Sequence, residues 1–502
     1  MDLQSLYYIS PELSLVALSL VLVALDLIAN LKKQITWIVL VGLILPLVFI
    51  AFLWVDVHDN ELPNRIFFAS LSLDHFALIF KALIILILFP IVLLSHQYST
   101  NYSIFRVEYF SLILISAVGM MLLSSANDLI TIYIALELTA IPIAALATFM
   151  REIRSVEAGM KFLILSAISS AILLYGLVLL YGYTGSVNLE IINSRILEIG
   201  QQNAVPFGSY ALLLAIAMIV AGFGFKIAIV PFQMWAPDVY EGSPLPVTAF
   251  LSVASKAAGF AVILRVFNIA FTNQEFSQMS IDWSLIWGVL AVLSMTIGNI
   301  VAIRQTKIIR LMAYSSVAHA GYILIGVTAV SSRLVDDIGL GVSAATFYLI
   351  AYAATNIAAF SVIVSVSKLS SNGLIQEFSG LKNRSLTLSI VMAIAVLSLI
   401  GLPPSVGFIA KFYLFGSAIS SGLEWLAVVG VLNSVVSAYY YLRILKYIFL
   451  SEPDDDEKID IFSMKPVLIS ALISMGIIFV LGVFPGPILE IAEIAADALL
   501  LV

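Results

Sequence analysis

About fourteen apolar stretches, each long enough to cross a lipid bilayer, occur along this chain of 502 residues. A helix needs roughly 20 apolar residues, at about 1.5 Å each, to span the hydrocarbon core. The composition agrees, because 62% of the residues are hydrophobic and only 11% are charged. The sequence therefore predicts an all-α, polytopic membrane protein with spans at 11–29, 36–54, 75–95, 107–125, 128–149, 158–182, 208–240, 245–268, 284–304, 310–330, 339–366, 386–419, 423–449 and 465–485.

The composition also excludes several kinds of chemistry. The chain contains no cysteine, which excludes disulfides, thiolate zinc sites, cysteine-ligated iron–sulfur clusters and a thiol nucleophile. Its formal net charge of −7 argues against a nucleic-acid partner. There is no Walker or Rossmann glycine motif and no histidine pair spaced for transmembrane haem, so redox chemistry is expected elsewhere. The acidic stretch 452–460 lacks the EF-hand pattern and is predicted to be a solvated loop.

Positive residues are distributed unevenly between the two sides of the predicted membrane. Of the 24 lysines and arginines, 15 fall on the side that is cytoplasmic if the N-terminus is outside, and 4 fall on the opposite side. The positive-inside rule then predicts both termini outside and an even number of spans. Residues 11–29 are predicted to be a retained first helix, because no positively charged n-region and no small-residue cleavage motif accompany them.

The remaining five positive residues are lysines within predicted spans: Lys81, Lys161, Lys226, Lys256 and Lys411. A charge at mid-membrane costs at least about 2.5–3.5 kcal/mol, so such residues often mark an ion or proton path. Lys81 and Lys161 lie near span ends, where snorkelling to the headgroups is an equal alternative. Lys256 lies near mid-span, and we expect a function rather than a static ion pair. Glu137 is the clearest mid-span acid.

Two spans are too long for the bilayer and contain prolines that predict discontinuous helices. Pro231 interrupts 208–240, and the pair Pro403–Pro404 interrupts 386–419. Proline removes a backbone donor and clashes with the preceding turn, which leaves carbonyl and amide groups unpaired inside the protein. A lysine accompanies each break, Lys226 five residues before Pro231 and Lys411 seven residues after Pro404. Ion sites in transporters are often built at such breaks.

The two broken spans are five apart, which predicts an internal repeat in which spans four to eight correspond to spans nine to thirteen. An odd repeat length inverts the second copy relative to the first. The predicted units are 1–104 with three helices, 105–270 and 271–450 with one repeat each, and 451–502 with the acidic loop and last helix. His319 could provide a relay between the halves or make a static hydrogen bond. Glu137 and Lys226 could form a movable ion pair.

Several long segments together resemble one known family. These segments are ALELTAIP at 135–142, SVEAGMKFLILSAISSAILLYG at 155–176, GFKIAIVPFQMWAPDVYEGSPLPVTAFLSVASKAAGF at 224–260, GNIVAIRQTKIIRLMAYSSVAHAGY at 298–322 and SLIGLPPSVGFIAKFYLF at 398–415. The chain from about 105 to 450 resembles the subunit N (subunit 2) family of proton-pumping NADH–quinone oxidoreductase, respiratory complex I, and its photosynthetic relatives. PDVYEG at 237–242 and a lysine at 411 are more similar to subunit N than to its antiporter-like sister subunits.

This resemblance implies fourteen helices, two inverted five-helix repeats and discontinuous helices 7 and 12. It implies that Glu137, Lys226, Lys256 and Lys411 translocate protons, and Lys161 matches a further family lysine. It also implies that this chain binds no redox cofactor and that NADH, FMN, iron–sulfur clusters and quinone are bound by other subunits. The implied partners are membrane-arm subunits, including the sister antiporter-like ones, in a bacterial plasma membrane or, alternatively, a thylakoid membrane.

Two positions depart from the family pattern. Gln233 stands where the family usually has histidine, and because glutamine cannot titrate we expect a structural role. Before span ten the family tends to have asparagine followed by a Lys–Arg pair, whereas here two isoleucines separate Lys307 from Arg310. For these charges we predict a topological role.

Two other functions remain open from the sequence. A cation/proton antiporter of the Mrp type would share the repeat and the lysines, but it would exchange sodium or potassium for protons without NADH. A structural membrane scaffold would hold the lysines in static ion pairs. Mutations in a scaffold would impair assembly rather than uncouple an assembled complex.

Overall fold

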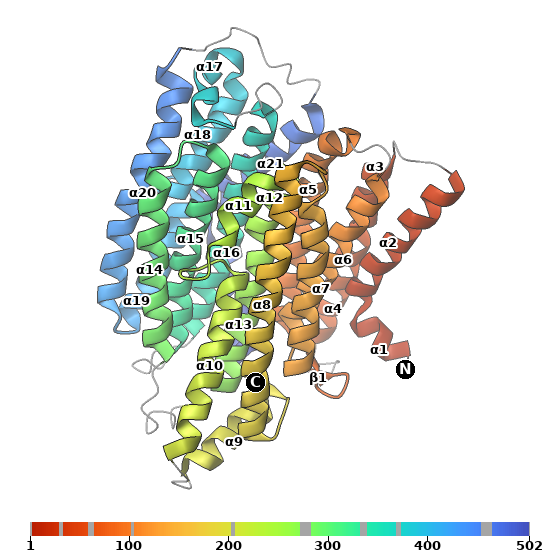
Figure 1. The fold of residues 1–502 in the computed structure, drawn as a ribbon, viewed down its shortest axis with the longest axis vertical. Helices are drawn as coiled ribbons and strands as arrows, with labels where there is room; N and C mark the ends of the chain where they lie inside the picture. Colours follow the sequence, from red (N-terminus) through yellow and green to blue (C-terminus); the bar gives the residue numbers. More distant parts are fainter. Residues whose placement is uncertain are drawn as a thin grey trace.

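The computed structural model describes residues 3–29, 34–58, 65–101, 105–201, 206–271, 283–331, 339–367, 373–452 and 464–500. These residues form a bundle of mostly upright helices, and both ends of the described chain lie in its lower half in Figure 1. The only sheet in the described ranges is the antiparallel hairpin of β1 (Arg65–Ile66) and β2 (Leu71–Ser72). The acidic stretch predicted to be a loop lies, from residue 453 on, outside these ranges.

The first half of the chain supplies the helices at the red to yellow-green end of Figure 1. Their bounds are α1 Leu3–Tyr8, α2 Ser10–Ala29, α3 Ile35–Gly42, α4 Ile44–His58, α5 His75–Asn101, α6 Arg106–Ser125, α7 Leu129–Ala147, α8 Ile153–Thr184, α9 Leu189–Gln201, α10 Pro206–Lys226, α11 Trp235–Gly242, α12 Leu245–Phe250, the π-helix η1 Leu251–Ser255 and α13 Lys256–Phe271.

The second half continues the bundle through the green and blue helices of the same view. Their bounds are α14 Trp283–Ile303, α15 Ile308–Ser331, α16 Gly339–Val366, the 3-10 helix η3 Ile375–Phe378, α17 Leu381–Arg384, α18 Leu386–Ile400, α19 Val406–Ser420, α20 Glu424–Leu450, α21 Lys465–Val483 and α22 Gly486–Leu500.

The number of membrane passes agrees with the prediction from the sequence. In the described ranges, 12 helical segments are long and apolar enough to span a bilayer. Two further passes are each made of two shorter helices, α10 with α11 and α18 with α19. The all-α membrane fold with about fourteen passes is therefore confirmed. The discontinuous helices 7 and 12 of the prediction are the seventh pass, α10 with α11, and the twelfth pass, α18 with α19.

The two discontinuous passes run in opposite directions, as Figure 1 shows. The chain ascends from α10 to α11, whereas it descends from α18 to α19. Residues 227–234 separate the first pair, and residues 401–405 separate the second. This opposite sense agrees with an inverted second repeat. We name the two ends of the bundle after short helices that lie there: the α17 end, predicted to be cytoplasmic, and the α9 end.

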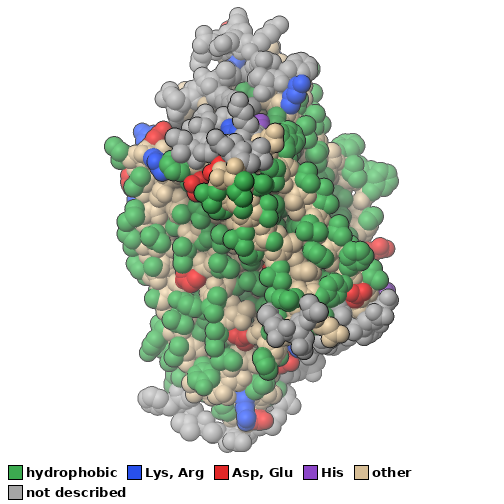
Figure 2. Space-filling view, turned by 90° about the vertical axis from the view of Figure 1, so that its right-hand side faces the viewer, with side chains coloured by type: hydrophobic (Ala, Val, Ile, Leu, Met, Phe, Trp, Pro, Cys, Tyr) green, Lys and Arg blue, Asp and Glu red, His purple; other side chains and the backbone are tan. Residues whose placement is uncertain are grey.

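The outer surface of the bundle is apolar along most of its height. Figure 2 shows hydrophobic side chains over the middle of one face, while the visible lysines and arginines lie near the two ends. Leu27 and Ile28 of α2 are more than 80% exposed, and leucine, isoleucine and valine side chains of α8 and α20 also face outward. Such a band would be costly in water, but it matches the hydrocarbon core of a bilayer.

The helices α14 and α15 pack closely because each helix has a glycine that faces the backbone of the other helix. A Cβ atom on Gly298 would lie 2.8 Å from the backbone nitrogen of Ala318, and one on Gly321 would lie 2.7 Å from that of Met295. Small residues permit this approach between membrane helices. The pair places Ser315, Ser316 and His319 of α15 in the interior of the bundle.

Candidate functional site

Three of the five lysines predicted within spans are buried near the broken or distorted parts of helices. Lys226, Lys256 and Lys411 are 6%, 2% and 5% exposed. They lie on α10, α13 and α19, three segments that are separate in sequence and that all contribute to the interior. None of the three can reach the headgroup region, so snorkelling does not account for them.

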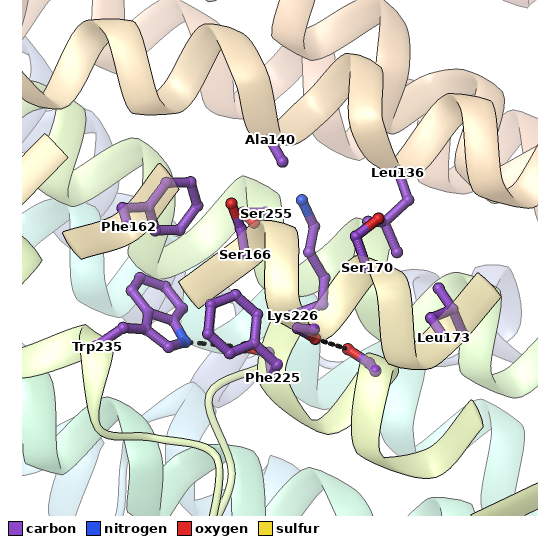
Figure 3. Close-up of a pocket in the computed structure, with 12 residues that line it drawn as sticks. Leu136, Ala140, Phe162, Ser166, Ser170, Leu173, Phe225, Lys226, Trp235 and Ser255 are labelled. Atoms are coloured by element: carbon purple, nitrogen blue, oxygen red, sulfur yellow. Dashed lines mark hydrogen bonds between the residues drawn. The ribbon is translucent and has the colours of Figure 1, made fainter. Parts of the chain in front are cut away.

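Lys226 is the last residue of α10, at the break that Pro231 predicts. Figure 3 shows its amine pointing toward α7 near Ala140, with Ser166 and Ser170 of α8 beside it. The amine donates a hydrogen bond to the Thr139 hydroxyl. The side chain lines a cavity of about 10 Å³, which is about the volume that one water molecule requires.

Glu137 lies at the middle of α7 and is half-buried. Its carboxylate accepts a hydrogen bond from the Ser170 hydroxyl of α8, and Ser170 lines the same cavity as Lys226. Among the described residues no ion pair joins Glu137 directly to Lys226, since each side chain is held by a neighbouring hydroxyl. The movable pair inferred from the sequence therefore remains a prediction.

Aromatic side chains form part of the wall of the Lys226 cavity. Phe162 packs edge-on against Trp235 with 5.0 Å between ring centroids, and Phe225 lies 5.5 Å from the same indole. The Trp235 indole donates a 3.0 Å hydrogen bond to the Phe225 carbonyl near the end of α10. The Phe225 carbonyl, which also accepts a 3.1 Å hydrogen bond from the Ala228 amide, is thus satisfied without Lys226.

Lys256 begins α13 directly after the π-helical turn η1, which the sequence did not predict. The amine donates to the backbone carbonyl of Ser316 on α15. Insertion of a π-helical turn widens a helix locally, and such turns occur often at functional sites. This contact joins α13, in the predicted first repeat, to α15, in the predicted second repeat.

His319 is buried at 3% exposure in a cluster of tyrosines between the two halves. Its Nδ1 atom lies 2.7 Å from the Tyr348 hydroxyl, and its Nε2 atom lies 3.2 Å from the Tyr441 hydroxyl. The Tyr322 ring lies 5.6 Å from the imidazole, and the Tyr352 ring lies 5.1 Å from it. The structure therefore places the predicted relay residue inside a hydroxyl-rich environment.

Lys411 lies at the break in the twelfth membrane pass, between α18 and α19, as the two prolines predict. Its amine donates to the carbonyls of Leu399 and Ile400 at 3.1 and 2.8 Å, and to the Ser434 hydroxyl of α20 at 2.8 Å. It also lies 4.7 Å from the centre of the Tyr322 ring. Carbonyls freed at the end of α18 thus hold an ammonium group, which compensates part of the cost of burying it.

Lys161 differs from these three because it is half-exposed and lies among other charges toward the α17 end. It pairs with Glu157 at 2.7 Å and with Asp238 of α11 at 3.0 Å. Arg310 contacts both Asp238 and Glu241 at 2.9 Å. A cavity of about 160 Å³ lies among Lys161, Asp238, Glu241 and residues of the first turns of α8.

Lys307 also belongs to this network, which the topological interpretation did not predict. It pairs with Glu241, so the start of α15 is tied to α11 through Lys307 as well as Arg310. The Lys307 side chain is 34% exposed. Its charge therefore contributes to local packing in addition to any effect on topology.

We expect Lys307→Gln to leave proton translocation intact. Arg310 keeps its contact with Glu241, and a partly exposed ion pair contributes only about 0–1 kcal/mol. The measurement is proton translocation per assembled complex, with Arg310→Gln as the comparison because Arg310 pairs with both Asp238 and Glu241. A large loss of translocation in Lys307→Gln at normal assembly would contradict this expectation.

Lys81 is buried rather than snorkelling, which resolves one alternative from the sequence. It is 2% exposed and pairs with Glu12 of α2 at 2.7 Å, with the Glu12 side chain 5% exposed. The pair joins the first and third passes. Sequence reasoning could not find it, because Glu12 lies at the beginning of the first span and gives no sign of its partner.

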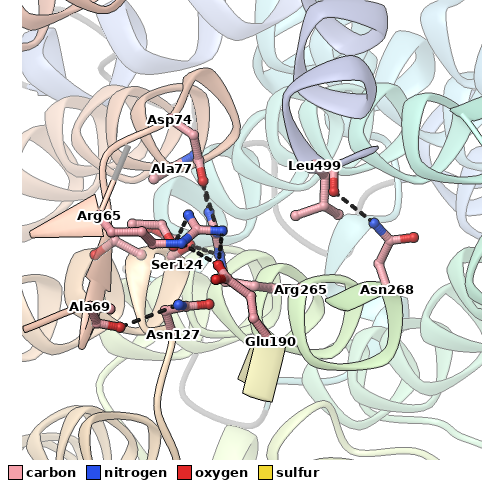
Figure 4. Close-up of polar contacts among 12 residues, drawn as sticks. Arg65, Ala69, Asp74, Ala77, Ser124, Asn127, Glu190, Arg265, Asn268 and Leu499 are labelled. Carbon is pink, nitrogen blue, oxygen red and sulfur yellow. Dashed lines mark hydrogen bonds and ion pairs between the residues drawn. The ribbon is translucent and has the colours of Figure 1, made fainter. Parts of the chain in front are cut away.

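A second buried ion pair lies at the α9 end and was also not predicted. Figure 4 shows Arg265 of α13 facing Asp74, and two parallel hydrogen bonds of 2.8 Å join them. The Arg265 Nε atom donates a third bond to the Ser124 carbonyl at 2.9 Å. Burial alone would raise the pKa of the Asp74 carboxyl, but the charge and hydrogen bonds of Arg265 outweigh it and lower that pKa.

Gln233 lies in the break between α10 and α11, where its side-chain oxygen is buried and has no hydrogen-bond partner among the residues that the structure describes. This position agrees with the predicted interruption of the seventh membrane pass. The structural role expected for the Gln233 side chain remains a prediction. In the described ranges no group of three or more His, Asp or Glu side chains is arranged to hold a metal ion.

Comparison with known proteins identifies the family. Residues 126–437 match the profile of the family described as NADH:quinone oxidoreductase/Mrp antiporter, TM. NADH-quinone oxidoreductase subunit N of Trichlorobacter lovleyi is 40% identical over 494 residues, covering 97% of this chain and 96% of that relative. The chain belongs to the NADH-quinone oxidoreductase subunit N family.

Two solved structures contain chains that are similar in fold to this subunit N family member. A chain of respiratory complex I from Thermus thermophilus, solved with bound aureothin, is 29% identical, with a TM-score of 0.73 over 96% of this chain and 98% of that one. A chain of the Mrp complex from a Dietzia species is 21% identical, with a TM-score of 0.80 over 100% of this chain and 98% of that one. At the lower identity the likeness shows the shared fold alone.

Proposed function

We propose that Glu137, Lys226, Lys256 and Lys411 carry protons across the membrane in this subunit N of an NADH–quinone oxidoreductase. The observation that carries the proposal is the burial of three lysines, at 6% exposure or less, in separate parts of one membrane bundle. Buried ionisable groups in a membrane are costly and are retained where protons or ions move. Lys161 and His319 would act as further relay points.

The two repeats would contribute different ends of this route. Unit 105–270 supplies Glu137, Lys226 and Lys256, while unit 271–450 supplies His319 and Lys411. The contact of Lys256 with the Ser316 carbonyl supports a connection between the units. A lysine amine can accept a proton and release it as its distance from neighbouring charges changes, so small movements at the two breaks would load and unload these sites.

Electron transfer belongs to other subunits in this proposal. NADH, FMN, iron–sulfur clusters and quinone would be bound there, and membrane-arm partners, including sister antiporter-like subunits, would transmit the coupling. The apolar outer band supports a location in a lipid bilayer. The subunit N relative from Trichlorobacter lovleyi supports the bacterial plasma membrane rather than the thylakoid membrane.

The test compares this function with Mrp-type antiport, which the shared fold keeps as an alternative. Inverted membrane vesicles from a strain lacking the chain, and from the same strain complemented with it, are supplied with NADH while acidification and quinone reduction are recorded. Sodium and potassium are replaced by choline. We expect NADH-dependent acidification to return with the complemented chain and to be unaffected by the cation. Proton translocation that requires sodium or potassium but not NADH would instead support the antiporter.

A further inference from the structure

The surroundings of His319 show how a proton could pass through it. Both imidazole nitrogens face a phenol hydroxyl, Tyr348 on α16 at Nδ1 and Tyr441 on α20 at Nε2. A neutral imidazole has one N–H donor and one acceptor nitrogen, whereas a phenol hydroxyl can donate or accept. The contacts are therefore compatible with either tautomer of His319.

The hydroxyl contacts continue from Tyr441 toward Lys256. The Tyr441 hydroxyl is hydrogen-bonded to the Ser315 hydroxyl. Ser315 is followed in α15 by Ser316, whose carbonyl accepts from the Lys256 amine. All of these side chains are 3% exposed or less. The hydrogen-bonded hydroxyls thus lead from Ser315 through Tyr441 to the Nε2 side of the imidazole, and the Lys256 amine lies at the residue next to Ser315.

On the other side, the tyrosine cluster extends to Lys411. The Tyr322 ring contacts both the His319 imidazole and the Lys411 ammonium, at 5.6 and 4.7 Å. Helix α20 carries Ser434, which binds Lys411, seven residues before Tyr441, so both side chains lie on one face of that helix. His319 is consequently enclosed between the environments of Lys256 and Lys411.

Charge makes this arrangement useful in an apolar interior. An isolated imidazolium is costly there, because few dipoles can solvate it. Exchange between the two neutral tautomers avoids that cost. An N–H bond forms at Nε2 as the Tyr441 O–H bond breaks, and the Nδ1–H bond breaks as its proton passes to the Tyr348 oxygen. The original Tyr348 O–H bond then breaks, and that proton is taken up by the neutral Lys411 amine, which becomes an ammonium group. Tyr441 regains a proton from Ser315, and Ser315 regains one from the Lys256 ammonium, which becomes a neutral amine. Rotation of the imidazole ring, which exchanges Nδ1 and Nε2, together with rotation of the hydroxyls restores the initial tautomer.

We propose that Tyr441 and Tyr348 are relay residues that pass a proton through His319 by exchange between its neutral tautomers. The inference rests on the proposed function, since it assumes that protons move between Lys256 and Lys411. It adds two tyrosines, and Ser315 next to Tyr441, to the residues that the sequence pointed to. Their sequence signal is weak: hydroxyl-bearing aromatics recur in YLIAY at 348–352 and AYYYLR at 438–443, within otherwise apolar helices.

The chain offers a matched control for Tyr441. Tyr109 is similarly buried at 1% exposure, and its hydroxyl makes a 3.0 Å hydrogen bond, but to Ser95 rather than to any residue of the relay. We expect Tyr441→Phe to lower NADH-driven acidification per assembled complex by on the order of ten-fold or more, and Tyr109→Phe to change it by less than about two-fold. Equal effects of the two substitutions at equal assembly would overturn the proposal.

A second pair of variants keeps the test decisive if Tyr441→Phe fails to assemble. Ser315→Thr retains a hydroxyl. Ser315→Val introduces a side chain of nearly the same shape as threonine but without a hydroxyl. We expect the threonine variant to retain acidification and the valine variant to lose it. If both retain it, or both lose it equally while assembled, the hydroxyl relay is wrong. Lys256→Ala is measured beside them: unchanged acidification there would refute the proposed function itself.

Discussion

Lys256→Ala is expected to lower both NADH-driven acidification and quinone reduction by about ten-fold or more, which corresponds to about 1.4 kcal/mol or more in the limiting barrier. The amine lies between the Lys226 break and the His319 cluster, and it is bound to the Ser316 carbonyl of the second repeat. Alanine removes the proton-carrying group at this junction. The measurement is vesicle acidification together with quinone reduction, normalised to assembled complex.

Two further variants separate loss of the amine from other effects. Lys256→Met retains an unbranched side chain of similar length, so packing is conserved while the proton-binding group is lost. We expect it to behave like Lys256→Ala. Lys446→Ala removes a positive charge from an exposed position on α20 and is expected to change neither rate. Normal rates in Lys256→Met would exclude a proton-carrying role for this lysine.

Asp74→Asn is expected to cause the largest loss of stability, about 3–5 kcal/mol, because it leaves the Arg265 charge buried without its counter-ion. Arg265 is 0% exposed and cannot give up its proton to escape that cost. The result would be a lower yield of assembled subunit and a lower unfolding temperature in detergent. Proton translocation per assembled complex should be unchanged.

The control for Asp74→Asn is another arginine–carboxylate pair at the same end of the bundle. Arg65 and Glu190 are 18% and 38% exposed and lie in the same region of Figure 4. Glu190→Gln should therefore cost only about 0–1 kcal/mol. Similar shifts in unfolding temperature for the two variants would show that burial does not set the strength of these pairs.

The lowered pKa of Asp74 also predicts the direction of an acid effect. A carboxyl group whose pKa is lower in the folded state stabilises that state above its unfolded pKa. That contribution is lost as the pH falls through the folded pKa. The wild-type subunit should consequently lose more stability on acidification below the ordinary range of aspartate than Asp74→Asn loses, a difference that the same unfolding assay records.

The sequence was sufficient for the features that depend on residues near one another in the chain. Apolar runs predicted the membrane passes, and Pro231 and Pro403–Pro404 predicted where the seventh and twelfth passes are interrupted. The Lys411 site follows the same logic, since the break that frees the Leu399 and Ile400 carbonyls is only a few residues from the amine they bind.

Contacts between distant helices could not be predicted in this way. Lys81 and Glu12 are far apart in sequence, and hydropathy shows each only as a polar residue in or beside a span. The tyrosines around His319 come from three different helices, and tyrosine in a membrane helix is equally typical of the headgroup region. The π-helical turn before Lys256 has no residue signature at all.

The close contact of α14 with α15 has a mechanical consequence for the proposed route. Gly298 and Gly321 fix the two backbones on both sides of His319, so this helix pair should behave as one stiff rod. The Ser294 hydroxyl of the same rod accepts a hydrogen bond from the Val230 amide beside the first break. Displacement during proton pumping would then be concentrated in the breaks at 227–234 and 401–405, and the first break would move against a helix pair that itself stays rigid.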